Sequence, residues 1–250
     1  MSERLRVAVI GARGRMGATT CAAVSGTDDL DLVAEIDQGD DLNDLVAANA
    51  EVAVVFSVPG VAREHVRFLI ANGVHAVVGT TGWDDDALTA VRHQLGDSPS
   101  VGVLIAPNFA LGAVLAMVFA QQAAALFESV EVIELHHPDK VDAPSGTAHR
   151  TAQLIAAARD HAGVAVPPDA TASALPGARG AAVDGIAVHS VRLRGLIAHE
   201  EILFGNPGEQ FTIRHDSFDR QSFMPGVLLG VRTVPGRAGL TVGLEHFMPL

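Results

Sequence analysis

The sequence predicts an α/β protein, with a doubly wound parallel sheet and a second α+β domain that contains a mixed or antiparallel sheet. Three observations predict this fold class. Short apolar runs alternate with helical segments through residue 110, a glycine-rich turn follows the first run, and strand-like runs are bunched after residue 180. Alternating strands and helices imply right-handed crossovers between parallel strands, whereas bunched strands favour an antiparallel or mixed sheet.

Five continuous apolar runs in the first half are typical of strands that are covered on both faces. Gly26 and Gly73 follow two of the intervening helices, as expected for residues that end a helix, and Pro59-Gly60 breaks the third strand. The predicted strands are residues 5–10, 30–36, 52–56, 75–78 and 101–106, and the predicted helices are 18–24, 63–71 and 84–95.

The second half changes character and indicates another domain. Its predicted elements are a buried helix at 111–127, a strand at 130–135, a polar loop at 136–146, a helix at 147–158, a long loop at 161–184, strands at 186–193, 200–204 and 211–215, a helix at 227–234 and a strand at 240–244. We therefore expect a first domain at 1–108, a second domain at 109–220, and a return of the chain to the first domain at 221–250.

Composition limits the classes of partner. The 250 residues carry 17 Lys and Arg against 29 Asp and Glu, a net charge of −12, which argues against nucleic-acid binding. The single cysteine, Cys21, excludes an internal disulfide and fits a cytoplasmic location. The longest weakly polar run, 109–120, is shorter than the roughly 20 apolar residues of a membrane span, so we expect no membrane association.

A glycine-rich turn after the first strand predicts dinucleotide binding by the first domain. Glycines let the backbone approach a pyrophosphate, and the helix that follows presents free N–H groups to it. Asp37, twenty residues after Gly17 and at the end of the second strand, could accept hydrogen bonds from ribose hydroxyls. The alternative is a plain turn between strand and helix. The turn is Gly11-Ala12-Arg13-Gly14-Arg15-Met16-Gly17.

Two arginines in this turn bear on which dinucleotide is bound. Arg13 and Arg15 could meet the extra phosphate of NADP, whereas Asp37 would repel that phosphate and suits NAD. Their presence together indicates tolerance of either cofactor. The alternative is that both arginines are solvated surface charges.

Two further loops follow predicted parallel strands, at the sheet edge where ligands of such folds bind. Their backbone groups could contact the nicotinamide end of the cofactor, although each could also be an ordinary loop. Trp83 could pack near the nicotinamide or merely cover the first loop. The loops are Gly79-Thr80-Thr81-Gly82 and Ala106-Pro107-Asn108-Phe109.

The densest chemistry lies between the strand at 130–135 and the next helix. His136 and His137 precede Lys140, and Ser145-Gly146-Thr147 opens the helix, where its N–H groups form an anion site. This combination suits a substrate carboxylate, and a histidine can supply a proton near neutral pH. We predict no metal, because H-E-x-x-H and cysteine partners are missing.

These residues resemble the dihydrodipicolinate reductases of bacterial lysine and diaminopimelate synthesis. The resemblance spans nearly the whole chain. It is carried by the glycine turn, the loops at 79–82 and 106–109, and above all by residues 136–148, with further similar stretches at 175–180, 188–192 and 214–216.

The resemblance implies that NADH or NADPH reduces a cyclic imine dicarboxylate, formed from 4-hydroxy-tetrahydrodipicolinate by loss of water, to tetrahydrodipicolinate. It implies that His136 is the general acid, that Lys140 binds a carboxylate and assists proton donation, and that His137, Gly146 and Thr147 hold the substrate. The second domain would also form a homotetramer through its sheet, and closure of the two domains would bring hydride and proton together. The implied cofactor-binding residues are Gly11, Ala12, Arg13, Gly14, Arg15, Met16, Asp37, Gly79, Thr80, Thr81, Ala106, Pro107, Asn108 and Phe109.

Four positions depart from the family pattern, and none is a residue implied to be catalytic. Val55 stands where Asp is usual, Val58 where His or another polar residue is frequent, Trp83 where Phe is usual, and Asp139 where many members have His. Asp139 puts a negative charge beside Lys140. The alternatives from the residues alone are another two-domain NAD(P) oxidoreductase with a small acidic substrate, or a dinucleotide sensor without turnover.

Overall fold

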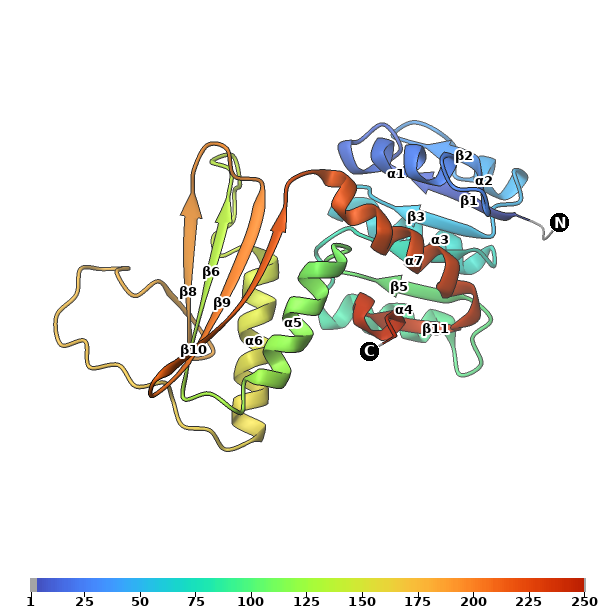
Figure 1. Ribbon diagram of the computed structural model, residues 1–250. Helices are drawn as coiled ribbons and strands as arrows, with labels where there is room; N and C mark the ends of the chain where they lie inside the picture. Colours follow the sequence, from blue (N-terminus) through green and yellow to red (C-terminus); the bar gives the residue numbers. More distant parts are fainter. Residues whose placement is uncertain (1–3, 250) are drawn as a thin grey trace. The chain divides into compact units, whose positions relative to one another are not determined.

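Residues 4–249 are described by the computed structural model, and they form two compact units (Figure 1). Unit 1 consists of the chain up to Ala110 together with the chain from Arg220 onward, and unit 2 spans Leu111–Asp219. The boundaries expected from the sequence were 108/109 and 220/221. The fold class predicted from the sequence is confirmed, because unit 1 holds a parallel sheet and unit 2 a mixed one.

Unit 1 is built on a six-stranded sheet whose strand pairs are all parallel. The strand order is β11-β5-β4-β3-β1-β2, so the direction of winding reverses between β1 and β3. β11, the last strand of the chain, pairs with β5 at the edge of this sheet. The strands are β1 (Leu5–Ile10), β2 (Leu30–Ile36), β3 (Val52–Val55), β4 (His75–Val78), β5 (Gly102–Ile105) and β11 (Gly239–Val242).

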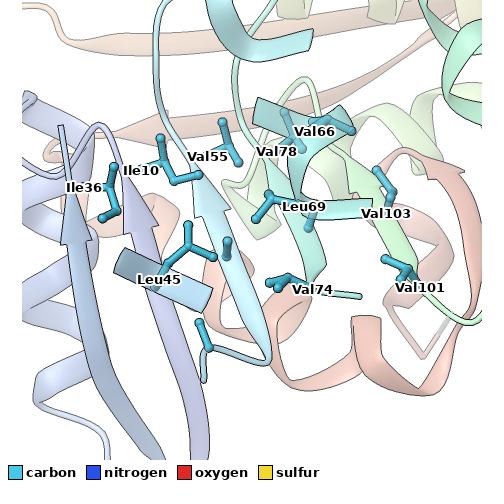
Figure 2. Packing of buried hydrophobic residues seen from close by; sticks show 14 of the residues in the cluster. Ile10, Ile36, Leu45, Val55, Val66, Leu69, Val74, Val78, Val101 and Val103 are labelled. Atoms are coloured by element: carbon cyan, nitrogen blue, oxygen red, sulfur yellow. The ribbon is translucent and has the colours of Figure 1, made fainter. Parts of the chain in front are cut away.

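Helices cover both faces of this sheet (Figure 1). On one face, Ile10, Val55 and Val78 pack with Leu45, Val66 and other apolar residues of the helices above them (Figure 2). The helices on this face are α2 (Asn43–Ala47), α3 (Pro59–Ala71) and α4 (Asp85–Leu95). The other face is covered by α1 (Arg15–Ser25) and α7 (Met224–Thr233), and short 3-10 turns occupy Arg220–Phe223, Val234–Gly236 and Leu244–Phe247.

Two helix starts differ from the prediction. α1 begins at Arg15 rather than 18, because the last residues of the glycine turn already form the first helical turn. α3 begins at Pro59 rather than 63, because proline is favoured in the first turn of a helix, where its missing N–H is not needed.

Unit 2 is a five-stranded sheet with two helices packed on one face (Figure 1). Its order is β10-β9-β6-β8-β7, with β6 and β8 parallel and the other pairs antiparallel. β7 lies in the stretch that was predicted to be a loop. The elements are α5 (Leu111–Ala123), β6 (Ser129–His136), α6 (Gly146–His161), β7 (Ala181–Val183), β8 (Ile186–Arg192), β9 (Ala198–Asn206) and β10 (Glu209–Ser217).

A buried arginine on α6 closes one end of unit 2. Arg159 is 4% exposed, and its guanidinium donates hydrogen bonds to the carbonyl oxygens of Ala124, Phe127, Glu128 and Ala165 at 2.7–3.2 Å. These carbonyls belong to the segment that links α5 to β6 and to the loop that follows α6. One side chain therefore satisfies backbone groups of two irregular segments that no regular structure pairs.

Replacing Arg159 with Leu should lower the free energy of unfolding by about 2–4 kcal/mol, because four carbonyls lose a charged donor. Urea unfolding followed by circular dichroism measures this change. Arg150→Leu is the matched control, since Arg150 is an exposed residue of the same helix. Equal stability of the two variants would contradict the structural role of Arg159.

Candidate active site

The glycine turn after β1 is packed so tightly that side chains cannot be accommodated at its ends. Gly11 has a φ of +85°, and a Cβ there would lie 2.6 Å from the carbonyl oxygen of Phe56. A Cβ at Gly17 would lie 1.9 Å from the carbonyl oxygen of Gly11. Gly14 caps the start of α1, so the free N–H groups of that helix begin inside the turn. This is the backbone cradle that a pyrophosphate needs.

Asp37, at the end of β2, is bound to this turn by hydrogen bonds. Its carboxylate accepts from the backbone N–H of Gln38 at 2.8 Å and from that of Arg13 at 2.6 Å. The same two bonds lower the pKa of Asp37, so the carboxylate is ionised and acts as an acceptor. The Arg13 guanidinium pairs with Asp40 at 3.0 Å, while Arg15 is exposed.

The loop after β4 is held by side chains of its own. Thr80 is buried, and its hydroxyl donates to the carbonyl oxygen of Ser57 at 3.1 Å. The indole N–H of Trp83 donates to the carbonyl oxygen of Thr80 at 2.9 Å, and the ring packs on the core of unit 1. Of the two roles considered for Trp83, covering the loop is the one that these contacts support. Thr81 is exposed beside them.

The loop after β5 contributes one structural side chain and one aromatic ring. Asn108 Oδ1 accepts from the backbone N–H of Ala110 at 2.8 Å, just before α5. Phe109 is buried and meets Phe56 edge to face, with ring centroids 5.9 Å apart. A Cβ at Gly79 would come within 2.2 Å of the Phe56 ring. The ends of β3, β4 and β5 are therefore in direct contact.

All fourteen cofactor-binding residues expected from the resemblance lie just after β1, β2, β4 or β5, twelve of them in loops and Arg15 and Met16 in the first turn of α1. These loops share the carboxyl edge of the parallel sheet, and the winding reverses between β1 and β3 at the same edge. Open α/β sheets bind their ligands at such a point. Phe56 and Ser57, which follow β3 at this edge, were not predicted as site residues. The available signal was the end of the predicted strand at 56, just before Ser57 and Pro59.

In unit 2, the predicted proton donor lies at the end of β6. Nδ1 of His136 is 2.5 Å from Oε2 of Glu134, and the His136 side chain is 14% exposed. Burial lowers the pKa of His136, and the neighbouring Glu134 carboxylate opposes that change. Among residues 4–249, no hydrogen-bond partner is found for Nε2 of this ring. The imidazole is thus held at one nitrogen and open at the other.

Lys140 is the only lysine of the chain, since the other sixteen of its 17 Lys and Arg residues are arginines. Nζ of Lys140 lies 2.6 Å from Oδ1 of Asp142. Partial burial acts to raise the pKa of Asp142, but the hydrogen bond and charge of Lys140 outweigh it and lower that pKa. The negative neighbour of Lys140 is therefore Asp142, whereas Asp139 is exposed.

The predicted substrate-binding residues lie along the same loop. Ser145 caps α6, with its hydroxyl oxygen accepting from the backbone N–H of Ala148 at 3.2 Å. Gly146 is exposed and Thr147 half-buried in the first turn of the helix. His137 is half-buried next to His136. A lysine, two imidazoles and a helix N-terminus thus lie within one short segment, which is chemistry suited to a small anion.

A buried carboxylate, that of Glu134, lies beneath this segment and was not predicted as a site residue. Glu134 is fully buried; Oε1 accepts from the backbone N–H of Ser145 at 3.1 Å, and Arg192 donates to both oxygens at 2.7 and 2.8 Å. Burial acts to raise the pKa of Glu134, but Arg192 and His136 outweigh it and lower that pKa. The available signal was the spacing of two from His136, which puts both side chains on one face of a strand.

Residues 4–249 contain neither a candidate metal site nor a candidate membrane-spanning helix. No group of three or more His, Cys, Asp or Glu side chains in this part of the chain could hold a metal ion. None of its helices is long and apolar enough to cross a membrane.

Comparisons with known proteins agree along the whole chain. The family described as "Dihydrodipicolinate reductase, N-terminus" matches residues 5–109, and "Dihydrodipicolinate reductase, C-terminus" matches residues 112–248. The chain is 62% identical over 246 residues to a 4-hydroxy-tetrahydrodipicolinate reductase of Nocardia farcinica, covering 98% of this chain and 99% of the relative. It is 60% identical over 248 residues to the protein of that name from Streptomyces griseus, covering 99% of each.

Solved structures give the same result. A dipicolinate-bound dihydrodipicolinate reductase from Paenisporosarcina sp. TG-14 matches with a TM-score of 0.87 and 39% identity, over 98% of this chain and 100% of that one. An apo scyllo-inositol dehydrogenase from Lactobacillus casei, with a TM-score of 0.61 and 12% identity over 99% of this chain and 93% of that one, shares the fold. This chain belongs to the dihydrodipicolinate reductase family.

Proposed function

We propose that this protein catalyses the NAD(P)H-dependent reduction of the cyclic imine dicarboxylate derived from 4-hydroxy-tetrahydrodipicolinate, giving tetrahydrodipicolinate in lysine and diaminopimelate biosynthesis. The observation that carries the proposal is the imidazole–carboxylate pair at the end of β6, beside the single lysine and the start of α6. Relatives about 60% identical over the full length are named for this activity, and the solved relative binds dipicolinate, a dicarboxylate.

The turn after β1 fits a bound dinucleotide. Its glycines leave room for a pyrophosphate against the backbone, the free N–H groups of α1 bind that anion, and the Asp37 carboxylate accepts from ribose hydroxyls. When bound, NADH or NADPH supplies the hydride. Arg15 brings a positive charge that can meet the extra phosphate of NADPH, while Arg13 already pairs with Asp40.

The residues after β6 bind the dicarboxylate and supply the proton. Lys140 exchanges the Asp142 carboxylate for a carboxylate of the substrate, and the N–H groups of Gly146 and Thr147 receive negative charge at the start of α6. The imidazolium of His136 protonates the carbanion that hydride addition leaves. Burial, which lowers the pKa of His136, makes the imidazolium a stronger acid.

The assembly is proposed to be a cytoplasmic homotetramer formed through the sheet of unit 2. The helices α5 and α6 pack on one face of this sheet. On the other face, Ile133, Leu135 and Leu203 are half-buried apolar residues between the charged side chains of Glu131 and Arg214. A second copy would cover these residues, as the family resemblance implies.

The function is tested by coupling the protein to a synthase that makes the substrate and following NADH and NADPH absorbance. Oxidation of either cofactor that depends on the synthase is the expected result. A dinucleotide sensor would bind cofactor without consuming it, and an oxidoreductase of another substrate would not respond to the synthase. Absence of synthase-dependent oxidation with both cofactors would overturn the proposal.

Lys140→Ala should lower kcat/KM by about 100-fold or more, because the substrate loses a charge-assisted contact while the dinucleotide site in unit 1 is intact. The dissociation constant of NADH, measured by fluorescence titration, should change less than about twofold by the same reasoning. Asp139→Ala is the control, since this exposed neighbour makes no comparable contact. A large loss of NADH affinity in Lys140→Ala would contradict the division of roles.

Replacing Arg13 and Arg15 together with Ala should weaken NADPH binding by about 10-fold and leave NADH binding within about twofold, because only NADPH carries the extra phosphate. Calorimetric titration with each dinucleotide measures both constants on one sample. Equal losses for the two cofactors would show that these arginines do not contact that phosphate.

A further inference from the structure

Glu134 and His136 form a pair that is built into the strand. They lie two residues apart on β6, so both side chains project from the same face, and Nδ1 of His136 is 2.5 Å from Oε2 of Glu134. Glu134 is fully buried, and Arg192 of β8 and the backbone N–H of Ser145 bind its oxygens at 2.7–3.1 Å. The carboxylate is therefore fixed from three sides.

These donors decide the charge of Glu134 and, with it, the tautomer of His136. A guanidinium bound to both oxygens and a backbone N–H stabilise the ionised carboxylate. An ionised carboxylate only accepts hydrogen bonds, so Nδ1 of the imidazole carries a proton in both charge states of the ring. Nε2 is then the nitrogen that gains and loses a proton, and no residue between 4 and 249 occupies it.

We propose that Glu134 is a positioning residue for proton transfer: it fixes the ring of His136 and keeps the proton on Nδ1, so that Nε2 is the donating atom. The proposal rests on the proposed function. In the step, the Nε2–H bond of the imidazolium breaks and a C–H bond forms on the substrate carbanion, leaving neutral His136 with Nδ1–H donated to Glu134. Solvent then restores the proton on Nε2.

Other charged groups around the pair leave Glu134 as the main stabiliser of the imidazolium. The ammonium of Lys140 and the guanidinium of Arg192 both disfavour a positive charge on His136, as does burial, whereas Glu134 favours it. Removing the charge of Glu134 should therefore lower the pKa of His136.

A second carboxyl group, Glu200 on β9, lies directly opposite Glu134 in the strand register. Burial raises the pKa of Glu200 to about 7, and its Oε2 accepts from the hydroxyl of Thr151 at 3.3 Å. Glu200 is thus neutral on the acidic side of that value, and the charge of Glu134 is one cause of the raised pKa.

The test is Glu134→Gln, which keeps the shape and removes the charge. Because the general acid must be protonated, kcat falls as pH rises through the pKa of His136. Loss of an opposite charge at this distance should move that falling limb to lower pH, by about one pH unit or more. At a pH above the limb, kcat of the variant should then be lower than that of the unmodified protein by about 10-fold or more. The KM for NADH should change less than about twofold.

Glu128→Gln is the control. It removes the same charge at an exposed position immediately before β6. Its pH profile should coincide with that of the unmodified protein. Coincidence of the Glu134→Gln profile with that of the unmodified protein would overturn the proposal.

A measurement without turnover separates this proposal from the proposed function. In ¹⁵N NMR of the unmodified full chain, assigned with His136→Asn, the neutral ring of His136 should show the proton on Nδ1. A proton on Nε2 would overturn the positioning role even if turnover were normal or Glu134→Gln failed to fold. If the unmodified protein oxidises neither cofactor while this tautomer is found, the proposed reaction fails and the Glu134–His136 arrangement stands.

Discussion

The contacts of the buried Glu134 carboxylate are the interactions on which the proposed chemistry of unit 2 depends. The carboxylate binds the ring of His136 on its own strand, the guanidinium of Arg192 on β8 and the backbone N–H of Ser145 at the start of α6. A buried ionised group is strongly unfavourable unless its partners are complete, so these elements are fixed relative to one another. Arg192 also donates to the carbonyl oxygen of Asp142 at 2.7 Å. The loop that carries Lys140 is thereby anchored close to both of its ends.

Unit 1 differs in this respect, because the part of its candidate ligand site that would hold the pyrophosphate is made of backbone groups. At Gly11 and Gly17 the main chain packs against itself so closely that a Cβ would collide with a carbonyl oxygen. Backbone N–H groups at the start of a helix can bind a phosphate without any change of protonation state or side-chain conformation. The proposed proton transfer, which does need a tuned pKa, is assigned to unit 2, where burial and Glu134 act on the pKa of His136 in opposite directions.

The sequence predicts what local patterns can encode. Continuous apolar runs predicted β1, β3, β4 and β5 because these strands are largely buried on both faces. By contrast, α2 has five residues and is too short to show a helical period. β7 was missed within a stretch rich in glycine, alanine and proline. Glu134 was missed because the alternation of β6 assigns its position to the core, where an apolar residue is expected. Its partner Arg192 lies 58 residues further along, beyond any spacing rule.

The pairing of Lys140 with Asp142 is compatible with the proposed exchange of Asp142 for a carboxylate of the substrate. The pair is partly exposed, with the Asp142 side chain 50% accessible, and such pairs contribute only about 0–1 kcal/mol. Asp142 stays hydrated when it is displaced, so a substrate carboxylate competes on nearly equal terms. An arginine would bind Asp142 through two parallel hydrogen bonds and exchange less readily. In a chain whose other Lys and Arg residues are all arginines, the compact ammonium at 140 is therefore the cation that suits the proposed exchange.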